Sequence, residues 1–222
     1  MAVLVAGGTG FLGTAVVREL LSAGYGVTAT WVVEAERGRL ASEPVELVEA
    51  DLFDPASADA AVASVPDLEA VVNLVGGFAD GPLVHETDPE DFARLMRLNV
   101  TPTFLLARAA MPRLVERGGG AFVGVSARTA QRPYPGAAAY STSKAAVLAL
   151  IQALDVEYRR DGVRCNAILP SVIDTPANRE AQPNADHSKW VAPEEIARVI
   201  RFLVSPDSAP TSGAAVPVYG RA

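Results

Sequence analysis

Continuously apolar runs alternate along the chain with longer segments whose apolar residues recur at helical spacing. The apolar runs predict strands at residues 3–6, 27–33, 45–50, 70–75, 121–126, 163–169 and 214–218. The segments with helical spacing predict helices at residues 14–23, 55–65, 88–114, 138–160 and 194–203. Strands that are apolar throughout and separated by helices are typical of a parallel sheet covered on both faces. We therefore expect an α/β fold with a doubly wound parallel sheet of about seven strands and helices on both faces.

The polar, proline-containing segment at residues 171–189 shows neither pattern, so we expect a loop or lid there. The chain has no internal linker, low-complexity tract or short-period repeat. Its 222 residues suit one α/β domain with a full hydrophobic core, and we expect residues 1–222 to form a single domain. Half of the residues are apolar and a fifth are charged, which is ordinary for a soluble globular protein.

Charge and cysteine content narrow the possible partners and compartments. The formal net charge of −7 and the lack of a basic stripe argue against nucleic-acid binding. Cys165 is the only cysteine, so no disulfide can form within the chain, which fits a reducing compartment. The apolar start has no basic region and turns glycine-rich at once, which favours a buried strand over a signal peptide. The apolar run at residues 145–154 is interrupted by Gln152 and is shorter than the roughly 18 residues of a membrane span. We expect a cytoplasmic protein that binds no membrane.

A glycine-rich turn directly follows the first predicted strand and opens the first predicted helix. The segment from Gly8 to Gly13 matches the pattern G-x-G-x-x-G. Glycines in this context allow a tight turn and the close approach of a pyrophosphate, which then sits on the helix N-terminus. The turn therefore predicts a Rossmann-type dinucleotide site, and a glycine-rich turn without a ligand is the alternative. The cofactor-binding residues expected from it are Gly7, Thr9, Gly10, Phe11, Leu12 and Gly13.

The end of the second predicted strand does not decide between NAD and NADP. An acidic residue at this place in the fold bonds the ribose 2′-hydroxyl of NAD. Trp31 stands there and supplies neither a carboxylate nor a cation, while Glu34 follows shortly after it. Arg37 or Arg39 could reach a 2′-phosphate, and either one could equally be a surface arginine. The sequence thus leaves NAD and NADP as open alternatives.

Tyr140 and Lys144 stand four residues apart in a predicted helix, so that their side chains share one face. Lysine is rare in this chain, which has two lysines and seventeen arginines. A nearby ammonium favours the phenolate, so we expect it to lower the pKa of Tyr140 toward neutrality. The spacing alone is also found on solvated helix faces. Together with the upstream glycine turn, it indicates a proton-transfer pair.

The glycine turn followed downstream by the Tyr140–Lys144 pair resembles the short-chain dehydrogenase/reductase family, and the resemblance covers nearly the whole chain. The turn is similar to the family's T-G-x-x-G-x-x-G variant, with Ala6 in place of the threonine. The resemblance implies that Tyr140 and Lys144 are the active-site pair and contact the cofactor, and that Asn99 helps to hold a proton-relay water. It also implies further cofactor contacts by Asp51, Leu52, Asn73, Gly76, Pro170 and Thr175.

One feature departs from the family pattern. The family has a serine about thirteen residues before the tyrosine, where it hydrogen-bonds the reacting oxygen. Ala127 occupies that position, and Ser126 lies one residue too early. A shift of one residue on a strand turns a side chain to the opposite face. Either residues 128–136 absorb the offset and Ser126 acts as the catalytic serine, or the serine is missing.

If the serine is missing, the chain resembles quinonoid dihydropteridine reductases, which lack it while keeping the tyrosine and lysine, and the likeness to them is strongest from Gly120 to Trp190. Those enzymes carry an Asp at the position of Trp31, so this chain differs from them in cofactor selection. The resemblance implies an NAD(P)(H)-dependent oxidoreductase that transfers hydride between nicotinamide and a small carbonyl, quinonoid or imine-like substrate. A dinucleotide-binding redox sensor or scaffold with little turnover is the alternative, and an isomerase or lyase on the same fold is a third reading.

His85 and His187 have no metal-ligand spacing around them, so we expect no metal site. The helix predicted at residues 138–160 is apolar on more than one face, and one face suffices to cover the sheet. The surplus, together with the helix around Phe104, predicts a homodimer or homotetramer.

Overall fold

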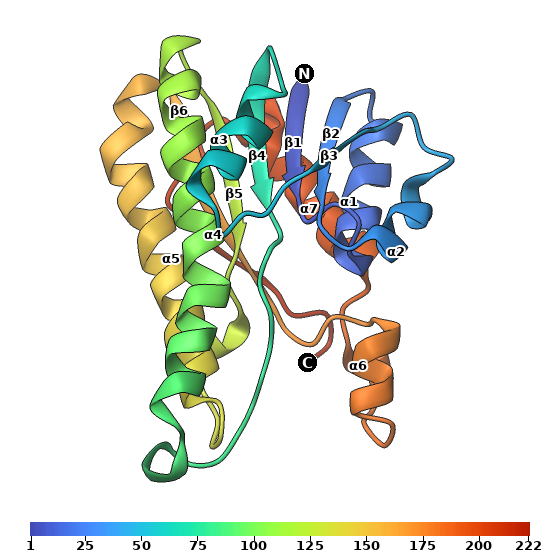
Figure 1. Cartoon of the computed structure of the whole chain (residues 1–222), viewed down its shortest axis with the longest axis vertical. Coiled ribbons are helices and arrows are strands. Elements are labelled where there is room, and N and C mark those ends of the chain that lie inside the picture. Colours follow the sequence, from blue (N-terminus) through green and yellow to red (C-terminus); the bar gives the residue numbers. More distant parts are fainter.

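The computed structural model describes all residues, Met1–Ala222, and its centre is a seven-stranded parallel sheet (Figure 1). The strand order is β3-β2-β1-β4-β5-β6-β7, and every neighbouring pair is parallel. The strands are β1 (Ala2–Ala6), β2 (Gly26–Trp31), β3 (Glu46–Glu49), β4 (Leu68–Asn73), β5 (Gly120–Val125), β6 (Val163–Pro170) and β7 (Ala215–Val218). The expected doubly wound α/β sheet is thereby confirmed.

Helices cover both faces of this sheet. They are α1 (Phe11–Ser22), α2 (Glu34–Arg37), α3 (Pro55–Ala63), α4 (Pro89–Glu116), α5 (Ala138–Tyr158), α6 (Pro176–Ala181) and α7 (Pro193–Val204). Figure 1 shows α3, α4 and α5 on one side of the sheet, with α1 and α7 on the other, and α1 packs along α7. None of these helices has the length and apolar character needed to cross a membrane.

Successive side chains of each strand point to opposite faces of the sheet and pack in two separate hydrophobic cores. On β4, Val71 joins the core beneath α3, α4 and α5, whereas Val72 joins the core beneath α1 and α7. On β5, Phe122 and Val123 divide in the same way. Both faces of each central strand are therefore apolar, and this is why these strands read as continuous apolar runs in the sequence.

The segment between β6 and α7 differs from the expectation of a loop or lid. It contains the short helix α6 and a 3-10 turn at His187–Lys189. Thr175 caps α6 by accepting a hydrogen bond from the backbone N–H of Asn178, and Pro176 occupies the first helical position. A capping threonine followed by proline is a helix-start signal that the polar composition of the segment concealed.

The chain reverses direction across the sheet between β1 and β4. From β1 the order runs outward through β2 and β3, and the chain then returns to place β4 on the other side of β1. In open α/β sheets, ligands bind at the carboxyl ends of the strands at such a switch point. The loops that follow β1 and β4 are therefore the expected place for a ligand.

Candidate functional site

The glycine turn after β1 is shaped by close backbone contacts. Gly7 has a φ of +75°, in the left-handed region that favours glycine. A Cβ atom on Gly13 would lie 2.2 Å from the carbonyl oxygen of Gly7, and one on Gly8 would lie 2.5 Å from the Cβ of Ala29. Gly7 and Gly8 also bond β2, through the hydroxyl and the carbonyl of Thr30 respectively. The turn is therefore held tightly against β2 at positions where only glycine fits.

The N-terminus of α1 opens directly from this turn. Gly10 is the N-cap residue, and neither a side-chain cap nor an acidic residue occupies the first turn. The first backbone N–H groups of the helix thus keep their hydrogen-bonding capacity, and the helix dipole favours an anion there. Thr9 is buried, whereas the ring of Phe11 is 41 % exposed beside the turn. This end of α1 fits a pyrophosphate.

The segment after β4 forms a second glycine cradle. A Cβ atom on Gly76 would lie 2.5 Å from Oδ1 of Asn99 and 3.0 Å from Nζ of Lys144. Asn73 turns its amide into the protein, where it donates to Oγ1 of Thr103 at 2.9 Å and accepts from the backbone N–H of Val75 at 3.0 Å. Asn73 thus shapes the segment after β4 through buried hydrogen bonds, while Gly76, which has no side chain, allows Asn99 and Lys144 to approach its backbone closely.

Asn99 links three elements of the site. Its side chain, which is fully buried on α4, accepts from the backbone N–H of Gly77 at 2.9 Å. Its Nδ2 donates to the carbonyl oxygen of Gly77 at 3.1 Å and to Oγ of Ser143 on α5 at 2.9 Å. All of the hydrogen bonds found for this amide therefore fix the protein itself. Asn99 positions the segment after β4 against α5.

Tyr140 and Lys144 lie one turn apart on α5, and Nζ of Lys144 is 5.9 Å from the centroid of the Tyr140 ring. Lys144 is buried, and its Nζ donates to the carbonyl oxygen of Val125 at the end of β5, at 3.2 Å. The ring of Phe78 meets the Tyr140 ring edge-on, with centroids 4.9 Å apart. The pair therefore stands at the carboxyl edge of the sheet beside Gly76.

The acid–base properties of the pair differ from the sequence expectation, which was that Lys144 lowers the pKa of Tyr140. Burial raises the pKa of Tyr140 above its ordinary value, and the Tyr134 phenol raises it further. Burial also lowers the pKa of Lys144 to about 8. Removal from water penalises both the phenolate and the ammonium, and burial is the largest cause of both shifts in pKa. The expected direction for Tyr140 was wrong because residue spacing reveals proximity but not the depth of burial.

Ser126 and Ala127 occupy different environments after β5. Ser126 is 1 % exposed, and its Oγ donates to the carbonyl oxygen of Lys144 at 2.7 Å. That hydrogen bond holds α5 against the end of β5 and occupies the hydroxyl. Ala127, thirteen residues before Tyr140, contributes only a methyl group.

The other residues expected at the cofactor site lie at the same edge of the sheet. Asp51 follows β3 and accepts from the backbone N–H of Phe53 at 2.9 Å, and the neighbouring Leu52 is buried. Pro170 ends β6, and Thr175 caps α6. The structure therefore gathers these four residues at the carboxyl ends of the strands, where the parallel topology directs them.

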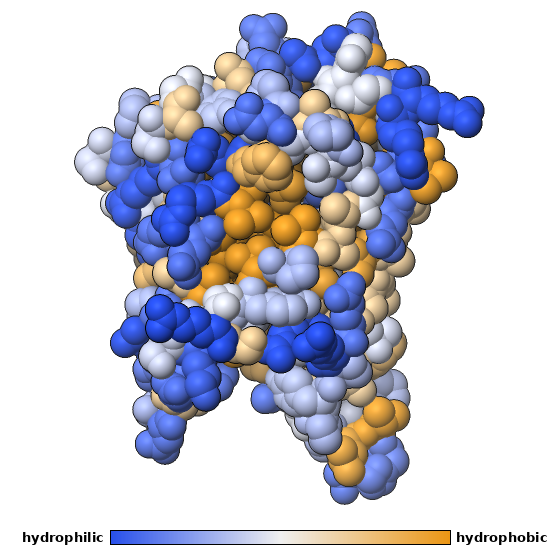
Figure 2. All heavy atoms as spheres, turned by 180° about the vertical axis from the view of Figure 1, so that it is seen from behind, coloured by the Kyte–Doolittle hydropathy of each residue, from blue (hydrophilic) through white to orange (hydrophobic).

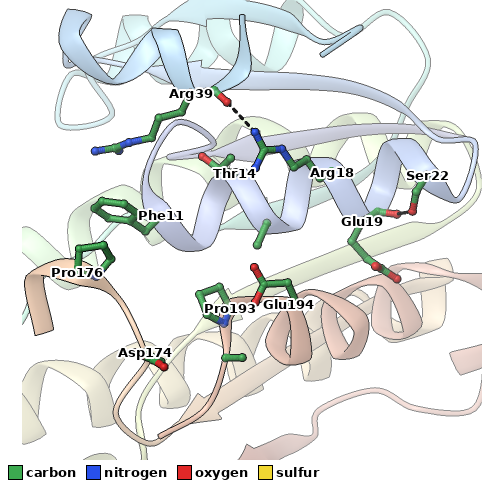
Figure 3. A pocket seen from close by; sticks show the side chains of 12 residues that line it. Phe11, Thr14, Arg18, Glu19, Ser22, Arg39, Asp174, Pro176, Pro193 and Glu194 are labelled. Carbon is green, nitrogen blue, oxygen red and sulfur yellow. Dashed lines mark hydrogen bonds between the residues drawn. The ribbon is translucent and has the colours of Figure 1, made fainter. Parts of the chain in front are cut away.

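A groove of about 730 Å³ runs between α1 and α7 and does not include Tyr140 or Lys144. Phe11, Arg39 and Pro176 stand at one end of it, and Glu19 and Ser22 at the other (Figure 3). Its contact with the functional site is the end at Phe11, next to the glycine turn.

Sequence reasoning missed three contributors to the site. Phe78 packs on Tyr140, Ser143 bonds Asn99, and Thr30 bonds the backbone of Gly7. Ser143 had a readable signal, since it lies three residues after Tyr140 on the same helix and so near the same face. Phe78 had none, because the segment after β4 has no regular structure from which its direction follows. No group of histidine, cysteine, aspartate or glutamate in the structure could hold a metal ion.

Comparisons with known proteins identify the family of the chain. The family model described as short chain dehydrogenase matches residues 1–186. The 2-(R)-hydroxypropyl-CoM dehydrogenase of Xanthobacter autotrophicus is 32 % identical over 195 residues, which cover 81 % of this chain and 78 % of that protein. The (3R)-3-hydroxyacyl-CoA dehydrogenase of Rattus norvegicus is 33 % identical over 205 residues, which cover 88 % of this chain and 74 % of that protein.

A solved structure extends the similarity to the whole fold. A short-chain type dehydrogenase/reductase from Mycobacterium ulcerans superimposes with a TM-score of 0.92 at 26 % identity, covering 99 % of this chain and 88 % of that one. These findings establish the family but not the dihydropteridine reductase-like branch. The chain therefore belongs to the short-chain dehydrogenase/reductase family and is an oxidoreductase.

Proposed function

We propose that this oxidoreductase exchanges hydride between a nicotinamide dinucleotide and a small carbonyl, quinonoid or imine-like substrate, with Tyr140 as the proton donor or acceptor. The observation that carries the proposal is the pair of half-buried Tyr140 and buried Lys144 beside Gly76, at the switch point of the sheet. The glycine turn and the bare N-terminus of α1 fit the pyrophosphate of the cofactor.

The residues of the chain would act on protons and on positioning, whereas the bound nicotinamide supplies or accepts the hydride. The raised pKa of Tyr140 keeps its phenol protonated at neutral pH, so that it is ready to protonate an oxygen or nitrogen during reduction. Lys144 would bind the ribose next to the nicotinamide and stabilise the phenolate that remains. Asn99 would hold the segment around Gly77 in place against α5.

The environment of Ser126 supports a site without the family's serine. Its hydroxyl is bonded to the Lys144 carbonyl, and Ala127 presents no donor. The reacting atom of the substrate would then receive one protein hydrogen bond, from Tyr140, instead of two. Loss of one donor at a developing oxyanion typically costs about 10²–10³ in rate. A substrate that is already polarised, such as a quinonoid ring or an activated carbonyl, needs this donor less.

Two features bear on the choice of substrate. The relatives from Xanthobacter and rat are named for hydroxypropyl and hydroxyacyl compounds, which supports a carbonyl–alcohol pair. Phe78 and Tyr134 are both partly exposed close to Tyr140, which supports a planar or apolar substrate. The two sets of features together favour an activated carbonyl or a quinonoid ring over a simple aliphatic ketone.

Turnover by the natural chain and by Ala127→Ser tests the proposal. Each is assayed with NADH and NADPH against quinonoid dihydropterin, a quinone, a 3-ketoacyl thioester and a simple ketone. We expect the natural chain to reduce an activated substrate and to reduce the simple ketone at least about 100-fold more slowly. Ala127→Ser should raise the rate with the simple ketone the most.

Two outcomes would contradict the proposal. Equal rates for simple and activated substrates would show that the missing serine does not restrict the reaction. Tight dinucleotide binding without turnover of any substrate would favour the redox sensor or scaffold instead.

A further inference from the structure

The ribose end of the site has an unusual arrangement of charges. Trp31 ends β2, where other dinucleotide folds place the carboxylate that reads the ribose. The guanidinium of Arg37 covers its ring at 4.6 Å and pairs with Glu34 at 2.9 Å. Arg37 and Glu34 are 44 % and 71 % exposed, and no hydrogen bond joins either of them to the glycine turn.

Glu36 and Arg39, which follow β2 in the same segment, form a second ion pair, and this pair is hydrogen-bonded to the glycine turn. Arg39 donates to the carbonyl oxygen of Thr9 at 2.8 Å and pairs with Oε1 of Glu36 at 3.0 Å. Its guanidinium lies 4.2 Å from the centroid of the Phe11 ring, and Figure 3 shows Arg39 above Phe11 at the end of the groove. The other carboxylate oxygen of Glu36 accepts from Oγ1 of Thr9 at 3.4 Å. The pair thus clamps α2 over the first glycines.

Glu36 places a carboxylate near the end of β2, where Trp31 supplies none. Glu36 reaches the turn from outside β2, and about a third of its side chain is exposed. The charge of Arg39 is balanced by Glu36, and its Nη1 contacts both Glu36 and the Thr9 carbonyl. A 2′-phosphate placed here would be repelled by the carboxylate of Glu36, with which the nearby Arg39 is already paired, whereas a 2′-hydroxyl could donate to that carboxylate.

We propose that Glu36 reads the ribose 2′-hydroxyl and that the chain therefore prefers NAD(H) to NADP(H), with Arg39 as a positioning residue. The inference rests on the proposed function only in that a dinucleotide must bind at the glycine turn. It assigns cofactor selection to a residue five positions beyond the end of β2.

Binding of the two adenosine halves tests this assignment without catalysis. Isothermal titration calorimetry compares 5′-AMP with adenosine 2′,5′-bisphosphate on the natural chain, Glu36→Gln, Arg39→Met and Arg39→Lys. The matched control is Glu34→Gln, which removes the same charge from the neighbouring ion pair, away from the turn.

We expect the natural chain and Glu34→Gln to bind 5′-AMP at least about tenfold more tightly than the bisphosphate. Glu36→Gln should reduce or reverse this preference, because the carboxylate is gone and Arg39 is released toward the phosphate. Arg39→Met should weaken 5′-AMP binding without improving bisphosphate binding, and Arg39→Lys should restore 5′-AMP binding because it keeps the charge next to Glu36.

Three results would overturn the assignment. Tighter bisphosphate binding by the natural chain would make Arg39 a phosphate ligand while leaving dinucleotide binding intact. Equal preferences in Glu36→Gln and Glu34→Gln would remove the specific role of Glu36. Failure of the natural chain to bind either nucleotide would overturn the proposed function itself, and the inference with it.

Discussion

Lys144 is a cation that is almost entirely removed from water. Its side chain is buried, and the carbonyl oxygen of Val125 is the one hydrogen-bond acceptor found for its Nζ. A hydrophobic side chain of similar length would suit this position better for stability. The retention of a buried amine beside Tyr140 is therefore best explained by chemistry, since function and stability commonly oppose each other at active sites.

Replacing Lys144 by methionine should stabilise the fold. A pKa of about 8 in the folded chain against 10.5 in the unfolded chain corresponds to a cost of roughly 3 kcal/mol at pH 7. We expect Lys144→Met to raise the free energy of unfolding at pH 7 by about 2–3 kcal/mol, measured by urea denaturation, and to abolish turnover.

The pH dependence supplies the control for this prediction. The unfolded chain holds the Lys144 proton up to higher pH than the folded chain, so the cost is complete below pH 8 and disappears as the pH rises to 10.5. The stability advantage of Lys144→Met should therefore shrink between these values. A destabilised variant, or an advantage that does not change with pH, would contradict the account.

At the level of elements, the site depends on how closely the glycine turn is packed between β1, α1 and β2. Gly13 cannot carry a side chain unless the backbone of Gly7 and Gly8 moves. Moving that backbone would also displace the N–H groups at the start of α1. A substitution at the junction between the glycine turn and α1 should therefore change both the stability of the fold and the binding of a pyrophosphate.

We expect Gly13→Ala to destabilise the fold by about 2 kcal/mol or more and to weaken dinucleotide binding at least about tenfold, as monitored by thermal denaturation and calorimetry. Gly38→Ala is the matched control, because a Cβ atom there meets no atom within 4 Å. It should change stability by less than about 1 kcal/mol. Similar effects of the two substitutions would show that the packing of the turn is not critical.

The sequence predicted the elements of the sheet well but predicted their immediate surroundings less well. β4 and β5 are apolar on both faces, so their identity follows from composition alone. α6 is one and a half turns long and polar, so it has no apolar face to reveal it. The i, i+4 spacing predicted that Tyr140 and Lys144 share one face of a helix, because that depends on local geometry alone. The pKa of Tyr140 could not be predicted in this way, because it depends on how other parts of the chain bury the side chain.

At the scale of the whole molecule, α4 and α5 leave apolar surface uncovered. Val147, Ile151 and Leu154 of α5 face the core, whereas Val156 is 68 % exposed, and Phe104 of α4 is 52 % exposed. On the face opposite to the view of Figure 1, apolar side chains also gather at the centre with polar ones around them (Figure 2). Exposed apolar surface of this kind is typical of subunit interfaces, and a homodimer or homotetramer stays our prediction.

A charged residue on α4 should weaken this association. We expect the natural chain to sediment as a dimer or tetramer, and Phe104→Glu to shift it toward the monomer because a carboxylate would be buried at the interface. Val84→Glu is the control, since Val84 is 71 % exposed but lies outside both helices. A monomeric natural chain, or equal effects of the two substitutions, would refute this interface.

We propose above all that Tyr140 passes a proton to or from the substrate at this site. The most direct measurement is kcat/KM for NADH-dependent reduction of an activated carbonyl or quinonoid substrate by the natural chain and by Tyr140→Phe, with NADH binding measured in parallel by calorimetry. We predict that Tyr140→Phe binds NADH as the natural chain does and loses at least about 100-fold in kcat/KM. Unchanged kcat/KM in Tyr140→Phe would contradict the account.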